Sequence, residues 1–134
     1  MTVVDTSVVV AAFASWHALH DAADSVIDGR ARLVAHCAVE TFSVLTRLPP
    51  PSRATAPLVR DFLADRFPDA YVTLDPDDYR ALIPRLVELG IGGGAAYDAL
   101  VAATARRAGE MLVSCDRRAA QTYQRLGADF LLLG

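Results

Sequence analysis

Lysine is absent from this chain, and all 13 of its basic residues are arginine. Mechanisms that need a lysine amine are therefore excluded, including the lysine-containing P-loop, Schiff-base and pyridoxal phosphate chemistry, and phosphoryl-receiver domains. GC-rich coding explains the absence, but the exclusion holds whatever its cause. Any catalysis must rest on other side chains.

Cysteine and long apolar runs are also scarce. Cys37 and Cys115 are too few for a disulfide framework, and both are expected as small buried residues in a reducing compartment. No stretch reaches the roughly 20 apolar residues that cross a membrane. The apolar run 8–14 follows Asp5, and no basic residue precedes Arg30, which does not fit a secretory signal peptide. We therefore expect a cytoplasmic protein with no membrane association.

The bulk composition argues against disorder and against a second domain. Apolar residues make up 53% of the 134 residues, and many of them are alanine and valine, as in compact α/β proteins. A chain of this length buries roughly two thirds of the surface that its unfolded form exposes. The proline-rich stretch 49–57 is the only linker-like segment, and it is too short to divide domains. We expect a single domain over residues 1–134.

Short apolar segments alternate with segments of helical character. The sequence predicts strands at 2–4, 32–35, 71–74, 111–114 and 130–133. It predicts helices at 8–14, 18–28, 37–48, 58–67, 76–89, 95–108 and 117–126. Strands separated by helices form parallel sheets, so the fold class is α/β, with a short central parallel sheet of about five strands flanked by helices. Pro84 should kink its helix or split it in two.

Four acidic residues follow strands or open helices in this pattern: Asp5, Glu40, Asp98 and Asp116. Asp5 and Asp116 lie at the carboxyl ends of the first and fourth strands, and Glu40 lies in the first turn of the helix after the second. Asp98 opens the helix that leads into the fourth strand, so that helix must begin at the carboxyl edge of the sheet. Ligands of parallel α/β sheets bind at this edge. The topology therefore predicts all four acids on one rim.

Each acid also has a simpler interpretation. Asp5 and Asp116 could cap the helices that follow them, and Glu40 and Asp98 could complement helix dipoles. Four such coincidences on one rim are less plausible than one shared site. Carboxylates brought together repel, unless a cation neutralises them or some stay protonated. The cluster therefore indicates a hard divalent metal, with metal-assisted phosphodiester cleavage as the leading hypothesis.

The net charge of −3 disfavours nonspecific nucleic-acid binding, which relies on a basic surface. This objection weakens if the acids hold metal. Two Mg²⁺ ions would add four positive charges at the place where a phosphate must dock.

Several short motifs occur along the chain in a fixed order. Asp5-Thr6-Ser7 follows a strand, Glu40 stands alone in the third helix, Tyr-Asp-Ala-Leu at 97–100 opens an alanine-rich helix, and Leu-Val-Ser-Cys-Asp occupies 112–116. Together they resemble the PIN domain, and in particular the VapC toxins of bacterial toxin–antitoxin pairs. The resemblance covers nearly the whole chain. Ser114 stands where the family more often has threonine, and both residues supply a hydroxyl.

The resemblance implies an endoribonuclease that depends on Mg²⁺, with Mn²⁺ as a substitute. It makes Asp5, Asp98 and Asp116 the main metal ligands and Glu40 a ligand or water-orienting group, so that all four are the expected catalytic residues. Water rather than the 2′-hydroxyl would attack phosphorus, and the products would carry 5′-phosphate and 3′-hydroxyl ends. The resemblance also implies a small antitoxin whose tail enters the acidic groove, and a homodimer.

Other polar residues near the rim have expected supporting roles. Ser7 and Ser114 are expected to hydrogen-bond carboxylates, waters or the scissile phosphate, with ordinary capping as the alternative. Arg117 is the best-placed candidate for a substrate phosphate contact, directly after Asp116. His36 ends the second strand near the rim and could line the site. The remaining candidate phosphate contacts, each more simply explained by a solvated helix face, are Arg47, Arg53, Arg106, Arg107 and Arg118.

Three other functions compete with this hypothesis. A metal-free ribonuclease needs paired histidines or histidine with lysine, whereas His17 and His20 are expected on a solvated surface. A noncatalytic PIN-like module for binding or assembly remains the main alternative. A phosphoryl-switch domain would need a second acid beside Asp5 and a lysine, and the chain has neither.

Overall fold

The computed structural model describes residues 1–134 and has eleven helices and strands. The strands are β1 (Thr2–Val4), β2 (Arg32–Leu33), β3 (Met111–Ser114) and β4 (Phe130–Leu132). The helices are α1 (Thr6–Phe13), α2 (His20–Asp28), α3 (Ala35–Thr46), α4 (Ala56–Arg66), α5 (Pro76–Leu89), α6 (Ala95–Ala108) and α7 (Ala120–Arg125). This alternation confirms the predicted α/β fold.

The four strands form one parallel sheet in the order β2-β1-β3-β4. In β1, Val3 and Val4 are fully buried, as are Leu112 and nearly all of Val113 in the neighbouring β3. Parallel strands covered on both faces are apolar throughout, which explains why these short segments carry no polar alternation. The centre of the sheet is therefore the centre of the core.

The predicted strand at 71–74 is wrong as a full strand. Only Val72 pairs, through an isolated parallel bridge to Val34. The chain turns into α3 at Ala35, whose N–H donates to the carbonyl of Val72 at 2.8 Å. Because β2 ends there, the segment has no further backbone to pair with, and the sheet has four strands instead of about five.

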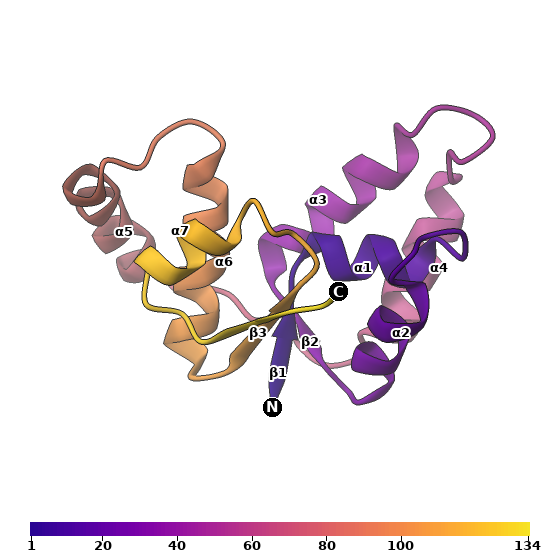
Figure 1. Ribbon diagram of the computed structural model, residues 1–134, viewed down its shortest axis with the longest axis horizontal. Helices are drawn as coiled ribbons and strands as arrows, with labels where there is room; N and C mark the ends of the chain where they lie inside the picture. The colour runs from indigo at the N-terminus through magenta and orange to yellow at the C-terminus, as the bar shows by residue number, and fades with distance from the viewer.

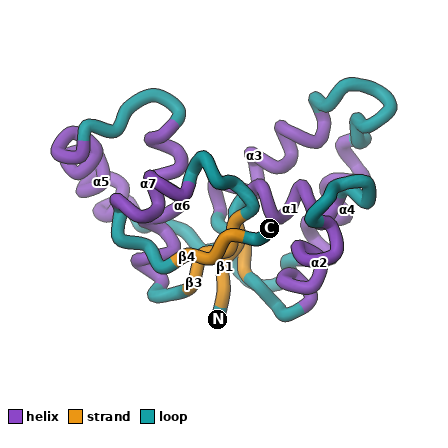
Figure 2. Tube along the Cα trace, viewed as in Figure 1, coloured by secondary structure: helices purple, strands orange, loops and turns teal.

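The helices lie in two groups on either side of the sheet (Figure 1). Helices α1 to α4 cover one side, and α5 to α7 cover the other, with the strands between them (Figure 2). The carboxyl end of β1 points into the space that separates the two groups (Figure 1). No helix is both long and apolar enough to pass through a membrane.

Local signals explain both ends of α5 and one wrong expectation about it. Asp75 caps α5 by accepting from the N–H of Asp78 at 2.8 Å, and Gly90 ends it with a left-handed φ of 65°. Pro84 lies within this single helix and does not split it. Pro84 and Arg80, whose carbonyl loses its hydrogen-bond donor, are both exposed, so water can satisfy that carbonyl.

Five of the seven predicted helices have different ends in the structure. The helices expected at 8–14 and 58–67 are Thr6–Phe13 and Ala56–Arg66. The helix expected at 18–28 begins at His20, and the one expected at 37–48 begins at Ala35 and ends at Thr46. The helix expected at 117–126 is shorter, Ala120–Arg125, because Asp116 opens a turn before it. Such turns depend on side-chain hydrogen bonds that periodicity does not reveal.

Candidate active site

All four predicted acids line one cavity of about 580 Å³ between the two groups of helices. Asp5 follows β1, Asp116 follows β3, Glu40 comes from α3 and Asp98 from the first turn of α6. Because all four parallel strands point the same way, the segments that leave them meet at this edge of the sheet. The further lining residues used below are Ser7, His17, His36, Cys37, Tyr97, Cys115, Arg118 and Tyr123.

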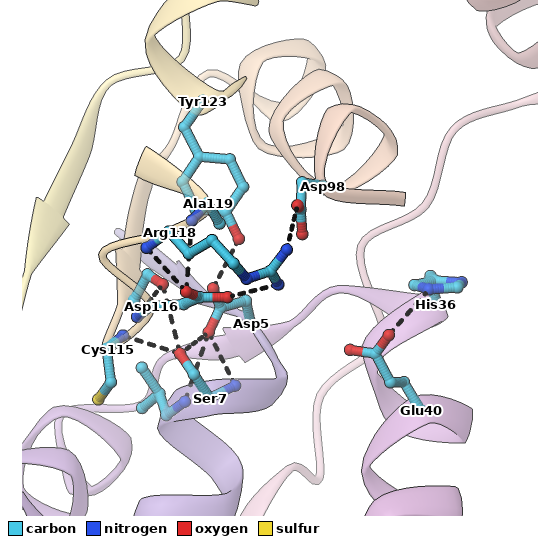
Figure 3. Close-up of polar contacts among 12 residues, drawn as sticks. Asp5, Ser7, His36, Glu40, Asp98, Cys115, Asp116, Arg118, Ala119 and Tyr123 are labelled. Atoms are coloured by element: carbon cyan, nitrogen blue, oxygen red, sulfur yellow. Dashed lines mark hydrogen bonds and ion pairs between the residues drawn. The ribbon is translucent and has the colours of Figure 1, made fainter. Parts of the chain in front are cut away.

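Asp5 is the most deeply held of the acids, with only 4% of its surface exposed. Its Oδ1 caps α1 by accepting from the N–H groups of Ser7 at 3.0 Å and Val8 at 3.4 Å. Its Oδ2 accepts from the hydroxyl of Tyr123 at 2.7 Å (Figure 3). Burial raises the pKa of the Asp5 carboxyl, and these hydrogen bonds oppose the rise. The fold therefore holds Asp5 in one orientation at the floor of the cavity.

Two serine hydroxyls connect Asp5 with the loop that carries Asp116. The Ser7 hydroxyl donates to Asp5 and accepts from the N–H of Cys115 at 2.8 Å. The single hydrogen of the Ser7 hydroxyl is used in the bond to Asp5. The hydroxyl oxygens of Ser7 and Ser114 lie 3.3 Å apart, so Ser114 is the donor between them. Ser114 in turn accepts from the N–H of Asp116 at 3.0 Å. This chain of bonds fixes the end of β3 against the start of α1.

Arg118 lies between Asp98 and Asp116 (Figure 3). Its guanidinium is 3.2 Å from Oδ2 of Asp116 and 3.9 Å from Oδ2 of Asp98. Burial raises the pKa of Asp98, Arg118 opposes this, and the carboxylates of Asp116, Glu40 and Asp5 raise it further. The repulsion expected among the acids is therefore a property of this cavity, and a cation already offsets part of it.

Glu40 faces the cavity from the other side. In Figure 3 it stands apart from the group around Asp5, next to His36 on the same helix. Its Oε2 lies 3.6 Å from Nε2 of His36, and its side chain is 43% exposed. Glu40 makes no closer polar contact in the structure, so it is free to reorient within the cavity.

The residues present fit a hard divalent cation in their chemistry. Four carboxylates face one cavity, carboxylate oxygens are preferred ligands of Mg²⁺ and Mn²⁺, and the guanidinium of Arg118 already occupies a cation position between two of them. In this arrangement no three potential ligands lie close enough together to share a metal ion. A metal held by three of these carboxylates would require them to move closer together, and one between Asp98 and Asp116 would take the place of the Arg118 guanidinium.

The two adjacent arginines after Asp116 point in different directions. The guanidinium of Arg117 donates to the carbonyl of Gly134 and does not line the cavity. Arg118 does line it, because the turn that follows Asp116 directs its N–H to Oδ1 of Asp116 at 2.9 Å and its side chain back over the acids. The structure thus places the four acids, Ser7 and Arg118 around one cavity and leaves Arg117 outside.

Tyr123 contributes to the cavity, although the sequence did not predict it as a site residue. It is 2% exposed and comes from α7, more than a hundred residues after its partner Asp5. A signal was present, because a tyrosine on the apolar face of a helix must find a partner for its hydroxyl when buried. Nothing in the sequence indicated that the partner would be Asp5.

His17 and His20, expected on a solvated surface, are both half-buried and make internal contacts. The ring of His20 contacts the carbonyl of Ala11 at 2.9 Å, and Nδ1 of His17 accepts from Leu19, so these two do not form a ligand pair. Both cysteines are free; Cys37 is buried and Cys115 half-buried. Burial raises the pKa of these thiols to about 12 and about 11, which makes them poor ligands and nucleophiles at neutral pH.

Comparison with known proteins identifies the family. A family model of the PIN domain matches residues 2–124. The chain belongs to the PIN-domain family. Ribonuclease VapC40 of Mycobacterium tuberculosis is 49% identical to this PIN domain over 129 residues, which are 96% of each chain. Ribonuclease VapC27 of the same organism is 38% identical over 125 residues, covering 92% of this chain and 90% of the relative. These relatives confirm the resemblance to VapC toxins.

Solved structures share the fold of this PIN domain at low sequence identity. FitAcB from Neisseria gonorrhoeae superposes with a TM-score of 0.70 at 15% identity, over 98% of this chain and 96% of that one. PAE2754 from Pyrobaculum aerophilum gives a TM-score of 0.62 at 24% identity, over 97% and 92% of the two chains. The arrangement of sheet and helices is thus retained where most side chains differ.

Proposed function

We propose that this PIN domain is a metal-dependent endoribonuclease and the toxin of a toxin–antitoxin pair. The observation that carries the proposal is that four carboxylates from four separate elements line one cavity. The support for RNA as substrate is the 49% identity to a ribonuclease over nearly the whole chain. A metal-free mechanism that uses lysine is excluded, because the chain has none.

Asp5, Asp98 and Asp116 would hold Mg²⁺, or Mn²⁺ in its place, and Glu40 would complete the set or orient the attacking water. When bound, such a metal supplies positive charge for the phosphate and lowers the pKa of water. Ser7 and Tyr123 hold Asp5 in position through their hydroxyls. The position of Glu40 on the opposite side of the cavity supports the water-orienting role.

The first test is cleavage of a total-RNA pool by the purified, antitoxin-free protein. With Mg²⁺ or Mn²⁺ we expect discrete fragments with 5′-phosphate ends, and with EDTA we expect none, because the carboxylates then lack the cation that a phosphate requires. Fragments that persist in EDTA would exclude the carboxylate mechanism. If no RNA is cut and Mn²⁺ does not bind, the noncatalytic binding or assembly module becomes the better explanation.

An antitoxin and a second copy of the chain are the proposed protein partners. Exposed apolar side chains on α3 and α5 support this, with 74% of Val39 and 77% of Val87 accessible. Apolar surface of this kind marks interaction sites when it is continuous. Further exposed apolar side chains on or next to the first, third and fifth helices are Trp16, Phe42 and Ile83.

Arg118 should compete with the metal. We expect Arg118→Gln to bind Mn²⁺ about twofold to fivefold more tightly by isothermal titration calorimetry, because the guanidinium no longer has to leave the carboxylates. The effect is modest since the arginine side chain is 75% exposed, and exposed ion pairs contribute roughly 1 kcal/mol or less. Arg117→Gln is the matched control and should leave the affinity unchanged. Weaker Mn²⁺ binding by Arg118→Gln would contradict the competition.

A further inference from the structure

A groove continues from the cavity along α3. It is lined by His36, Val39, Glu40, Ser43, Arg47 and Tyr97, and three of these residues, His36, Glu40 and Tyr97, also line the acidic cavity. A chain that lies across the acids can therefore enter this groove without leaving the protein surface.

An aromatic pair stands where the groove meets the cavity. The rings of His36 and Tyr97 are stacked, with centroids 5.3 Å apart and planes 8° from parallel. Tyr97 remains 58% exposed, although it precedes Asp98 directly. His36 supports the tyrosine ring from one side, so its orientation is set before any ligand arrives. An exposed aromatic ring with a fixed orientation is a stacking platform for a nucleobase.

A cation without an acidic partner stands at the far end of the groove. Arg47 ends α3, is exposed, and its Nη1 donates to the hydroxyl of Ser43 at 3.1 Å. It makes no ion pair, whereas Arg30, Arg60 and Arg85, which are also exposed, each pair with an acid. Along a helix, His36 and Arg47 are separated by about 16 Å, which leaves room for more than one nucleotide.

We infer that this groove binds the nucleotides next to the scissile phosphate, with a base stacked on Tyr97 and a phosphate paired with Arg47. The inference rests on the proposed function and adds a base-binding subsite to it. Every base has an aromatic face, so the subsite should accept any of the four. The ring and the unpaired cation favour RNA over a protein segment as the occupant, because together they match the alternation of base and phosphate.

The test is a double-mutant cycle between Tyr97 and the base. The Asp98→Asn protein, which should cut at least about a hundredfold more slowly, is titrated in Mg²⁺ with a fluorescent oligouridylate and with the same oligonucleotide made of abasic nucleotides. Adding Tyr97→Ala should weaken binding of oligouridylate about tenfold. It should leave binding of the abasic strand almost unchanged, whereas Tyr97→Phe should keep both affinities.

Matched controls separate the loss of a base-binding subsite from a general loss of RNA affinity. Tyr79→Ala removes a tyrosine of similar exposure, 44%, from α5 and should have no effect. Arg47→Gln should lower the salt dependence of RNA binding by about one ion, whereas Arg60→Gln, from an arginine paired with Asp61, should not.

Two results would overturn the subsite. One is a Tyr97→Ala protein that loses no more RNA affinity than Tyr79→Ala. The other is a Tyr97→Ala protein that keeps its RNA affinity but escapes inhibition by the antitoxin, which would assign the face to a protein partner. If the wild-type protein neither binds nor cuts RNA, the proposed function itself is wrong. If it cuts RNA and only the cycle fails, the subsite alone is wrong.

Discussion

Asp98→Asn should reduce RNA cleavage by about a hundredfold to a thousandfold at saturating Mg²⁺, because the amide keeps the shape of the side chain and removes its charge. Burial raises the pKa of Asp98, the other three carboxylates raise it further, and Arg118 lowers it. Loss of the Asp98 charge should therefore weaken binding of the proposed cation. The measurement is the initial rate of cleavage of one defined RNA. Asp77→Asn, in the first turn of α5, is the control.

The same substitution should stabilise the metal-free protein at neutral pH. The pKa of Asp98 is raised above its usual value of 3.8, so the unfolded chain releases this proton at a lower pH than the folded protein does. Stability in EDTA should then fall as the pH rises above 3.8 and through the folded pKa, and the uncharged amide of the variant cannot contribute to that fall. We expect a midpoint of thermal unfolding a few degrees higher for the variant, a trade of stability for function. A lower midpoint for the variant would contradict the expectation that the charge of Asp98 destabilises the metal-free protein.

Tyr123→Phe should have the second large effect. Removing the hydroxyl leaves Oδ2 of the buried Asp5 without its 2.7 Å hydrogen bond. The free energy of unfolding should fall by about 1–3 kcal/mol, as for other buried polar groups that lose a partner. Urea denaturation measures this change. Tyr71→Phe, from an exposed tyrosine, should leave the stability unchanged.

Tyr123→Phe should also change the pH dependence of cleavage. The tyrosine hydroxyl lowers the pKa of Asp5 by bonding its ionised form, so its removal should raise that pKa further. A cation binds the ionised carboxylate, and the acidic limb of the rate profile should therefore move to higher pH. A variant with reduced activity but an unshifted acidic limb would mean that Tyr123 acts on packing alone.

Topology made the meeting of the four acids predictable. Asp5 and Asp116 end neighbouring parallel strands, and Asp98 opens the helix that must return to the amino edge before β3. These placements follow from the alternation of strands and helices, which the apolar pattern reveals. The sequence could not show how each acid is satisfied, because partners such as Tyr123 and Arg118 depend on tertiary packing and on the geometry of one turn.

Two adjacent arginines show most clearly what could not be predicted from the sequence. Arg117 and Arg118 have the same chemistry, and proximity to Asp116 favoured the first as a substrate contact. Hydrogen bonds from the N–H groups of Arg118 and Ala119 to Asp116 form the turn that directs the second over the acids.

Likewise, the apolar pattern at 71–74 is that of a strand, and only the position at which α3 begins leaves Val72 with a single partner.

The bond between Tyr123 and Asp5 has a consequence for synthesis of the protein in the cell. The two residues are 118 positions apart, and β1 also needs β3 beside it before Asp116 reaches the cavity. A ribosome adds about 5–20 residues per second, so roughly 6–24 seconds separate the synthesis of Asp5 from that of Tyr123. A nascent chain that ends before α7 therefore carries an incomplete acidic site. The ribosome that makes the protein meets the finished site only once α7 has emerged from it.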